Sequence, residues 1–325
     1  MRSSEFEYLP IPARAINAIK SAINPAMKTA WWMVRLTVTV SLAVTVFQYF
    51  GIVAWLAKLL NPLFNLVGLP GESALVFISG YFVNIYSAIT VVVTLDIGYR
   101  AITILAVMCL CSHNMIIETA VQKKTGSSAL RMVLLRTTAS FVSAFILNWI
   151  LPAETIVSAE NKDIITLPLK DIAINWSIST SVLAIKMFVL ILSLNILQKL
   201  LAEFGVIRLL SKLLRPILKI FGLPAKTSFL WIVANILGLA YGAAVMIEET
   251  EQGKISKNDV DLLNHHIAIS HSNLEDISLF LSIGASLWWM LIIRWILAAI
   301  AVWLRRMENN LRQSKYRLPF KEQKI

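Results

Sequence analysis

The sequence FGIVAWLAKLLNP at residues 50–62 returns 154 residues later as FGVIRLLSKLLRP at residues 204–216. Both copies continue without a gap to a Gly-Leu-Pro element, at 68–70 in the first copy and at 222–224 in the second. Ten of the 21 aligned positions are identical. A repeat of this kind predicts an amphipathic helix at the same point of two structurally equivalent halves.

The sequence around these copies is too hydrophobic for a soluble domain. Of the 325 residues, 57% are hydrophobic and 15% are charged, whereas soluble domains are about 45–50% apolar and about 25% charged. Apolar blocks such as 31–50, 75–95 and 288–304 approach the ~20 residues that a helix needs to cross a bilayer. A backbone in lipid must satisfy its own hydrogen bonds, so these blocks predict an all-α integral membrane protein.

Charge and cysteine content exclude other classes. The net charge is +11, but the basic residues lie in short stretches beside apolar blocks, as residues that determine membrane topology do. We therefore expect the lipid bilayer, and no nucleic acid, as a macromolecular partner. Cys109 and Cys111 lie within an apolar run and are expected to be packing residues. No phosphate-binding glycine loop or metalloprotease motif occurs, so we expect no cofactor and no enzyme activity.

The two halves stay similar beyond the repeated element. Each continues into an apolar segment with a polar interruption, at Gly80 to Asn84 and at Asn235 to Gly238. A Ser-His pair with carboxylates downstream follows in each half, and an apolar segment closes each half near 131–151 and 284–304.

The distribution of Lys and Arg predicts which stretches lie in the cytoplasm. Basic stretches are the N-terminus, 123–136, 199–226 and the residues after 305, whereas 51–72, 152–171 and 248–261 are acidic or neutral and are expected outside. Between the external stretch 51–72 and the cytoplasmic stretch 123–136 the chain must cross the membrane an odd number of times, yet two apolar segments lie between them. The same conflict occurs in the second half, between 226 and 305. We therefore expect 101–118 and 262–283 to enter the membrane and return, which gives two inverted-topology repeats. Eight full spans are the alternative.

The predicted architecture has about six full transmembrane helices, two re-entrant or broken helical hairpins and two amphipathic interfacial helices. Both termini are expected in the cytoplasm. The predicted units are a cytoplasmic or interfacial segment 1–30, a first membrane repeat 31–151, an external acidic loop 152–171, a second membrane repeat 172–304 and a basic cytoplasmic tail 305–325.

Polar residues inside apolar segments are the candidate binding residues, because ionisable groups in a membrane are costly and usually face a cavity or a partner. They can bind a solute or ion, or alternatively only cap broken helices; whether any of them binds a metal stays open. The candidates are His113, Asn114, Glu118, His271, Ser272, Asn273, Glu275, Asp276, Asn84 and Asn235. No catalytic residue is expected.

The order amphipathic helix, Gly-Leu-Pro, apolar segment and Ser-His-(Asn/Ser) followed by Glu resembles the nucleoside recognition, or Gate, domain family of bacterial inner-membrane proteins. That family includes spore maturation proteins and is related to gate regions of nucleoside transporters and ferrous iron permeases. The resemblance covers about 50–150 and 204–304 and implies a role in membrane transport or gating. The matched motifs contribute His113, Asn114, Glu118, His271, Ser272 and Glu275.

Together these observations predict a multi-pass transporter or permease of the bacterial cytoplasmic membrane. A small polar solute or ion is expected to bind between the two halves, at the facing His/Glu motifs. Two alternatives remain open: a non-transporting gating or scaffold subunit, and an intramembrane metal-dependent enzyme. The sequence fits either a monomer or a homo-oligomer.

Overall fold

The computed structural model describes residues 10–95, 97–152 and 168–316, and these residues form helices and no strand. The N-terminal half contains α1 (Ile11–Tyr49), α2 (Ile52–Asn65), α3 (Ser73–Phe82), α4 (Ile85–Val92), α5 (Tyr99–Ser112), α6 (Met115–Lys124) and α7 (Ala129–Ile150). The C-terminal half contains α8 (Leu169–Glu203), α9 (Val206–Leu213), α10 (Arg215–Ile220), a 3₁₀ turn (Ala225–Thr227), α11 (Ser228–Ile236), α12 (Leu239–Glu251), α13 (Lys257–Ile267), α14 (Glu275–Leu281) and α15 (Leu287–Tyr316).

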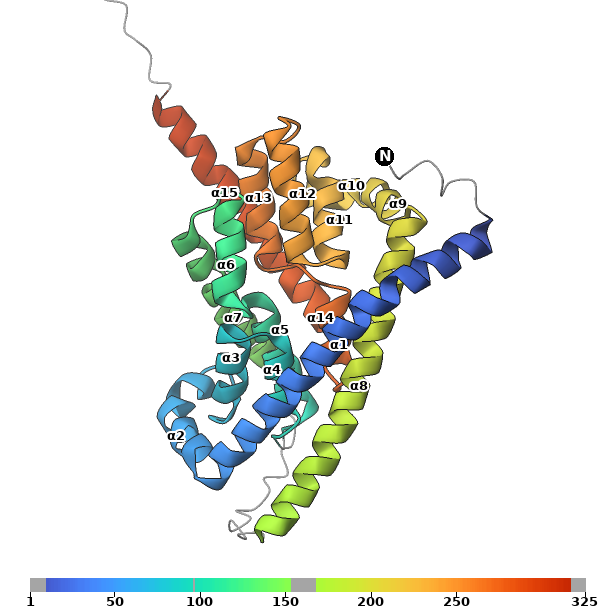
Figure 1. Cartoon of the computed structure of the whole chain (residues 1–325). Helices are drawn as coiled ribbons and strands as arrows, with labels where there is room; N and C mark the ends of the chain where they lie inside the picture. Colours follow the sequence, from blue (N-terminus) through green and yellow to red (C-terminus); the bar gives the residue numbers. More distant parts are fainter. Residues whose placement is uncertain (1–9, 96, 153–167, 317–325) are drawn as a thin grey trace, which may run out of the picture.

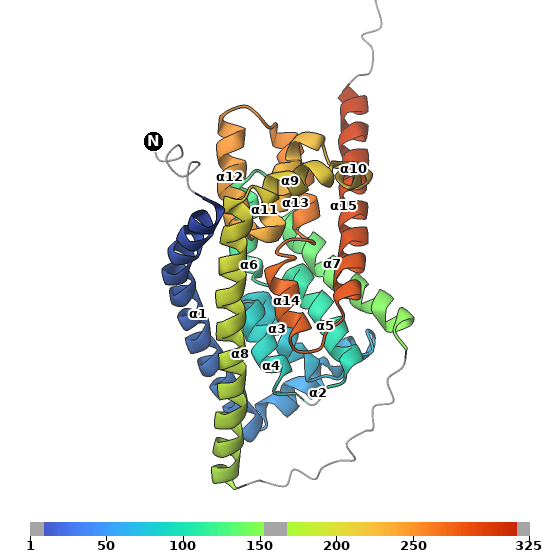
Figure 2. The same cartoon turned by 90° about the vertical axis from the view of Figure 1, so that its right-hand side faces the viewer.

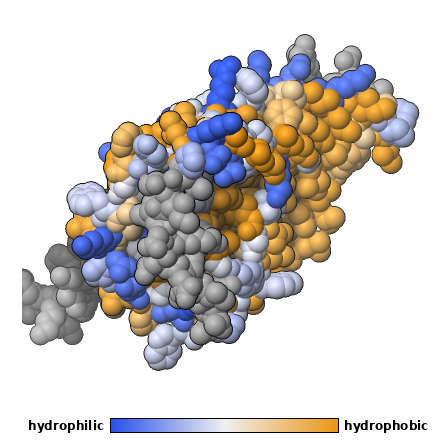
Figure 3. Space-filling model, turned by 90° about the horizontal axis from the view of Figure 1, so that it is seen from below, coloured by the Kyte–Doolittle hydropathy of each residue, from blue (hydrophilic) through white to orange (hydrophobic). Residues whose placement is uncertain are grey.

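The all-helical membrane class is confirmed. Five helical segments of the described chain are long and apolar enough to cross a bilayer: Ile11–Tyr49, Tyr99–Lys124, Ala129–Ile150, Leu169–Glu203 and Leu287–Arg312. Large hydrophobic side chains lie exposed on their outer faces, among them Trp149 at 82% and Ile185 at 65%. Figure 3 shows the resulting broad hydrophobic area on one side of the molecule. Such a surface suits a lipid environment.

The chain reverses direction between α3 and α4 and again between α11 and α12. A methyl group added at Gly80 would lie 3.2 Å from Cβ of Ala88, so α3 and α4 lie side by side as a hairpin. In the second half a methyl group at Gly242 would lie 3.1 Å from Cβ of Ala234, and α11 and α12 are close in the same way. Small residues allow this close approach of two helices.

This location differs from the sequence prediction, which placed the fold-back in 101–118 and 262–283. Tyr99–Lys124 instead forms one candidate span of 26 residues, with a break at His113 and Asn114. The chain bends at each Ser-His motif without reversing its direction. Sequence alone did not separate the two possibilities, because both segments of each half are apolar and both carry a polar interruption.

The two broken segments run antiparallel to each other. The amide of Ser286, which follows α14, donates to Thr103 Oγ1 near the start of α5 at 3.2 Å. At the other end, Asn264 of α13 donates to Thr125 Oγ1, directly after α6, at 2.9 Å. The long helices α1 and α8 pack along each other, also in opposite directions (Figures 1 and 2).

The prediction that separated 248–261 from 123–136 by the membrane is wrong. Ser127 donates to Asp261 Oδ1 at 2.7 Å, so the two stretches meet at one end of the molecule. The acidic character of 248–261 suggested an external loop, but acidic residues contribute little to membrane orientation.

Several predicted boundaries differ from the helix ends. Helix α1 continues through residue 30, and α15 continues from Leu287 to Tyr316, past residue 304. The helices expected at the repeated element are present as α2 and as α9 with α10. Most of the predicted acidic loop 152–171 lies outside the described residues, as do 1–9 and 317–325.

Candidate functional site

Each broken segment bends at a residue in the left-handed region of backbone space. Asn114 has φ 50° and Ser272 has φ 49°, an uncommon conformation for residues other than glycine that is worth about 1 kcal/mol or more of strain. The amide of Asn114 donates to Gly80 O at 2.8 Å, and the amide of Ser272 donates to Ala234 O at 3.1 Å. Each bend is thereby fixed against the hairpin of its own half.

Arg136 of α7 stabilises the first bend through hydrogen bonds to backbone carbonyls. Its Nε donates to Cys111 O at 3.0 Å and its Nη2 donates to His113 O at 2.7 Å. These carbonyls belong to the last residues of a helix end, which lack partners within the helix. Nη2 also lies 2.6 Å from Glu118 Oε2, and the arginine is fully buried.

Arg294 of α15 makes the equivalent contacts in the second half. Its Nε donates to Ile269 O at 2.9 Å and its Nη2 donates to His271 O at 2.8 Å. Its Nη1 donates to Asn273 Oδ1 at 2.9 Å. The two arginines are 158 residues apart, the same separation as the two histidines whose carbonyls they bind.

The bends bring ionisable side chains of both halves together in the interior. His113 Nε2 lies 3.1 Å from Glu118 Oε1 and 3.2 Å from Asp276 Oδ2. His271 Nε2 lies 3.1 Å from Glu118 Oε2, and the two imidazole rings are 5.1 Å apart. All four side chains are at least nine-tenths buried. We call His113, Glu118, His271 and Asp276 the central cluster.

The orientation of both histidines is fixed by backbone carbonyls. His113 Nδ1 lies 3.0 Å from Cys109 O and His271 Nδ1 lies 2.7 Å from Ile267 O. A carbonyl oxygen only accepts, so Nδ1 of each ring is the donor in these hydrogen bonds. The Nε2 atoms are therefore the ones that face the carboxylates.

A cavity of about 380 Å³ lies beside the central cluster and is lined in part by residues of both hairpin bends. In it the hydroxyl of Tyr86 donates to the carboxylate of Glu275, which joins α4 to α14. Its lining includes Trp32, Met33, Asn84, Tyr86, His113, Asn114, Glu118, Gly238, Ser272, Glu275 and Asp276.

The structure brings the predicted site residues into one region. Seven of the ten line the cavity: Asn84, His113, Asn114, Glu118, Ser272, Glu275 and Asp276. The other three, His271, Asn273 and Asn235, do not line it. His271 belongs to the central cluster, and Asn273 Nδ2 donates to Asn235 Oδ1 at 2.6 Å.

The sequence analysis missed Arg136, which it assigned to the basic stretch 123–136. A usable signal existed, because Arg136 and Arg294 share the 158-residue offset of the two Ser-His motifs. A second, larger cavity of about 860 Å³ lies between α1, α8 and the ends of α4 and α5, and it is lined by Lys186, a basic residue within the apolar helix α8. That cavity contains no residue of the central cluster, so its greater size does not make it the better candidate.

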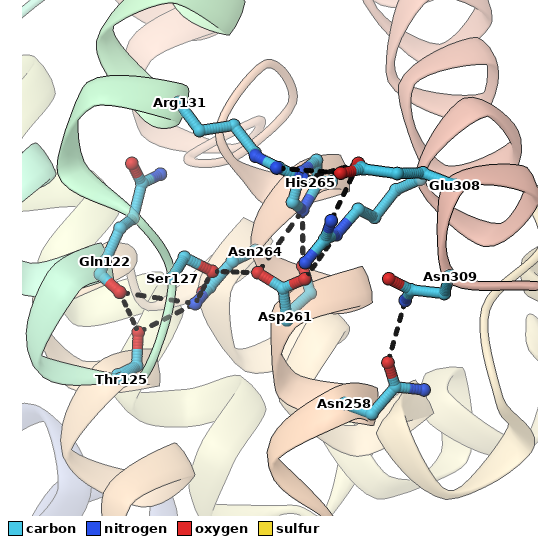
Figure 4. Close-up of polar contacts among 11 residues, drawn as sticks. Gln122, Thr125, Ser127, Arg131, Asn258, Asp261, Asn264, His265, Glu308 and Asn309 are labelled. Carbon is cyan, nitrogen blue, oxygen red and sulfur yellow. Dashed lines mark hydrogen bonds and ion pairs between the residues drawn. The ribbon is translucent and has the colours of Figure 1, made fainter. Parts of the chain in front are cut away.

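A second polar cluster joins the two halves at the end of the molecule where α6 ends and α13 begins (Figure 4). Ser127 donates to Asp261, and Arg131 pairs with Glu308 at 2.6 Å. We call this group the end cluster; Figure 4 labels its residues Gln122, Thr125, Ser127, Arg131, Asn258, Asp261, Asn264, His265, Glu308 and Asn309.

Fold and site thus define a polytopic helical membrane protein with an ionisable cluster buried between two similar halves. Residues 30–153, in the first half of the chain, match the model of the Gate family, described as nucleoside recognition. The chain is also 29% identical over 282 residues to the uncharacterized membrane protein YvoD of Bacillus subtilis (strain 168). The aligned region covers 84% of this chain and 89% of YvoD. No solved structure matches the chain significantly.

Proposed function

We propose that the protein is a transporter or permease that moves a polar solute or ion through the cavity between its two halves. The observation that carries this proposal is the composition of the cavity wall. Both hairpin bends and both broken-segment bends reach it, with ionisable groups from each half. Ionisable residues at membrane depth are typical of substrate and ion pathways. The Gate domain, a family associated with membrane transport or gating, supports the same conclusion.

The proposed topology consists of two inverted repeats with six crossings and two re-entrant hairpins. The five candidate spans supply five crossings, and α13 with α14 supplies the sixth. The hairpins are α3–α4 and α11–α12. The antiparallel broken segments and the matching contacts of Arg136 and Arg294 support this arrangement. Inverted repeats with discontinuous helices near the midplane are common in secondary transporters.

The end of the molecule that carries the end cluster is the proposed cytoplasmic side. Basic residues gather there, including Lys123, Lys124, Arg131, Lys226, Arg305 and Arg306. The positive-inside rule places such residues in the cytoplasm. Both the start of α1 and the end of α15 lie at this end (Figure 1), so both termini would be cytoplasmic, in a bacterial cytoplasmic membrane.

Flux through the reconstituted protein tests this function. Proteoliposomes would be assayed with nucleosides, amino acids, organic acids and divalent metal ions. We expect saturable flux of one class, reduced at least tenfold by Glu275→Gln, because this carboxylate lines the cavity. Lys186→Met, in the other cavity, is the matched control and should retain flux.

The opposite result would favour a different role. If the folded protein shows no saturable flux of any class, the transport function is refuted. Co-purification of a stoichiometric partner would then support the gating or scaffold alternative.

A further inference from the structure

We propose that His113, His271 and Glu118 form a binding site for one first-row divalent transition-metal ion, with Asp276 as a further oxygen ligand. Binding of the metal ion is argued from the central cluster alone. That the bound ion is also the transported solute rests on the proposed transport function of the same cavity.

The spacing of the donor atoms suits a single ion. One ligand atom each from His113, Glu118 and His271 lie within 4.8 Å of one another. The individual contacts are 3.1 Å from each histidine Nε2 to a Glu118 oxygen and 3.2 Å from His113 Nε2 to Asp276. Neighbouring ligands at about 2.0–2.2 Å from a metal lie about 2.8–3.6 Å apart in octahedral or tetrahedral sites.

Three of these atoms lack a hydrogen bond of good geometry. Within the described residues, Glu118 Oε2, His271 Nε2 and Asp276 Oδ2 are buried without a hydrogen-bond partner. Glu118 Oε2 is paired with Arg136 Nη2 at 2.6 Å, and the other two atoms lie at ion-pair distance from another member of the central cluster. Buried polar atoms are normally hydrogen-bonded, and exceptions need a specific explanation such as a bound ion. With Nδ1 of His271 donating to a carbonyl, a neutral ring turns its Nε2 lone pair toward a carboxylate. A cation between them removes the repulsion between two acceptors.

Contacts around the central cluster hold its side chains in the orientations that metal ligands need. Metal-bound histidines usually donate their other ring nitrogen to a carbonyl or carboxylate, and ligating carboxylates are themselves hydrogen-bonded or paired. Both histidines have such a Nδ1 contact, to Cys109 O and to Ile267 O. Arg136 lies 2.6 Å from Glu118 Oε2 and holds this carboxylate in place.

The donor types select the class of ion. Imidazole nitrogen with carboxylate oxygen suits Zn²⁺, Fe²⁺, Co²⁺ and Ni²⁺, whereas Mg²⁺ and Ca²⁺ prefer oxygen alone. His113, Glu118 and Asp276 also line the cavity of about 380 Å³, so an ion bound there would have an open side. Metal sites that keep a position open can exchange a ligand, whereas closed four-ligand sites are structural. With Asp276 also bound, the open side requires a coordination number above four, as in octahedral sites.

Binding can be measured directly with Co²⁺, whose visible ligand-field absorption reports coordination by protein. Tag-free protein in detergent, stripped with a chelator, would be titrated with Co²⁺. We expect one Co²⁺ per chain, displaced by Zn²⁺ and unaffected by excess Mg²⁺. This measurement uses the unmodified protein and needs no variant.

Three substitutions locate the site. His113→Gln and His271→Gln should each weaken Co²⁺ binding by at least about tenfold. His265→Gln is the matched control, because His265 on α13 is buried like the other two histidines but belongs to the end cluster. Co²⁺ affinity should be unchanged in this variant.

The outcomes separate the metal site from the transport function. No ligand-field band, or equal affinity in His271→Gln and His265→Gln, would overturn the metal site, and flux of another solute would then leave transport standing. A band lost in His113→Gln and His271→Gln supports the site. If Co²⁺ binds in this way without crossing proteoliposome membranes, the metal site stands and the assignment of the metal ion as the transported solute fails.

Discussion

Replacing Arg294 by Gln should destabilise the protein strongly, because this side chain satisfies the broken segment of the second half. Arg294 is fully buried and donates to Ile269 O, His271 O and Asn273 Oδ1. A glutamine amide can replace one of these hydrogen bonds, which leaves two buried acceptors without a donor. At about 1–3 kcal/mol for each unsatisfied acceptor, the loss is about 2–6 kcal/mol of unfolding free energy.

The assay is reversible unfolding in mixed detergent, with Arg306→Gln as the matched control on the same helix. Arg306 donates to the single acceptor Gly222 O at 2.6 Å and is partly exposed. We expect the control to lose about 1 kcal/mol or less. If Arg294→Gln loses no more than Arg306→Gln, the carbonyls at the break do not depend on the arginine. The account of both bends would then be wrong, since Arg136 has the same role.

Three further predictions follow from the packing and the cavities. Gly242→Ala should cost about 1–3 kcal/mol in the same unfolding assay, because the added methyl group would lie 3.1 Å from Cβ and 3.2 Å from the backbone Cα of Ala234. Cysteines at Ser127 and Asp261, which hydrogen-bond at 2.7 Å, should form a disulfide on oxidation and lock the two halves together; flux that persists in the oxidised protein would show that this end need not open. Lys186→Met should change neither flux nor Co²⁺ affinity, because Lys186 lies in the separate cavity of about 860 Å³.

The sequence predicted the residues of the site better than the path of the chain. His113 and His271 were recognisable because each stands in a polar motif within an apolar run, at the same place in both copies of the repeat. Ionisable groups are costly at such positions, so the composition alone marked them. Their approach to 5.1 Å between ring centroids required the antiparallel packing of the two halves, which no local pattern specifies.

The hairpins and Arg136 show where local patterns fail. The charge rule predicted one re-entrant segment in each half, but it counts crossings and does not say which apolar segment turns. The structural signal is the pair of small residues Gly80 and Ala88, whose closeness is meaningful only once α3 and α4 are side by side. Arg136 was counted as a loop residue because a buried arginine and a cytoplasmic arginine have the same effect on composition.

The proposed metal site would couple ion binding to the contact between the halves. Glu118 belongs to the first half and reaches His271 of the second, while Asp276 of the second half reaches His113 of the first. Any movement that separates the halves at this level must break both contacts. The atoms that would hold an ion therefore also join the two halves at this level, and a bound ion would add attraction between carboxylate and imidazole across the boundary. Occupancy should then favour the closed arrangement, and release should require one half to withdraw its ligands.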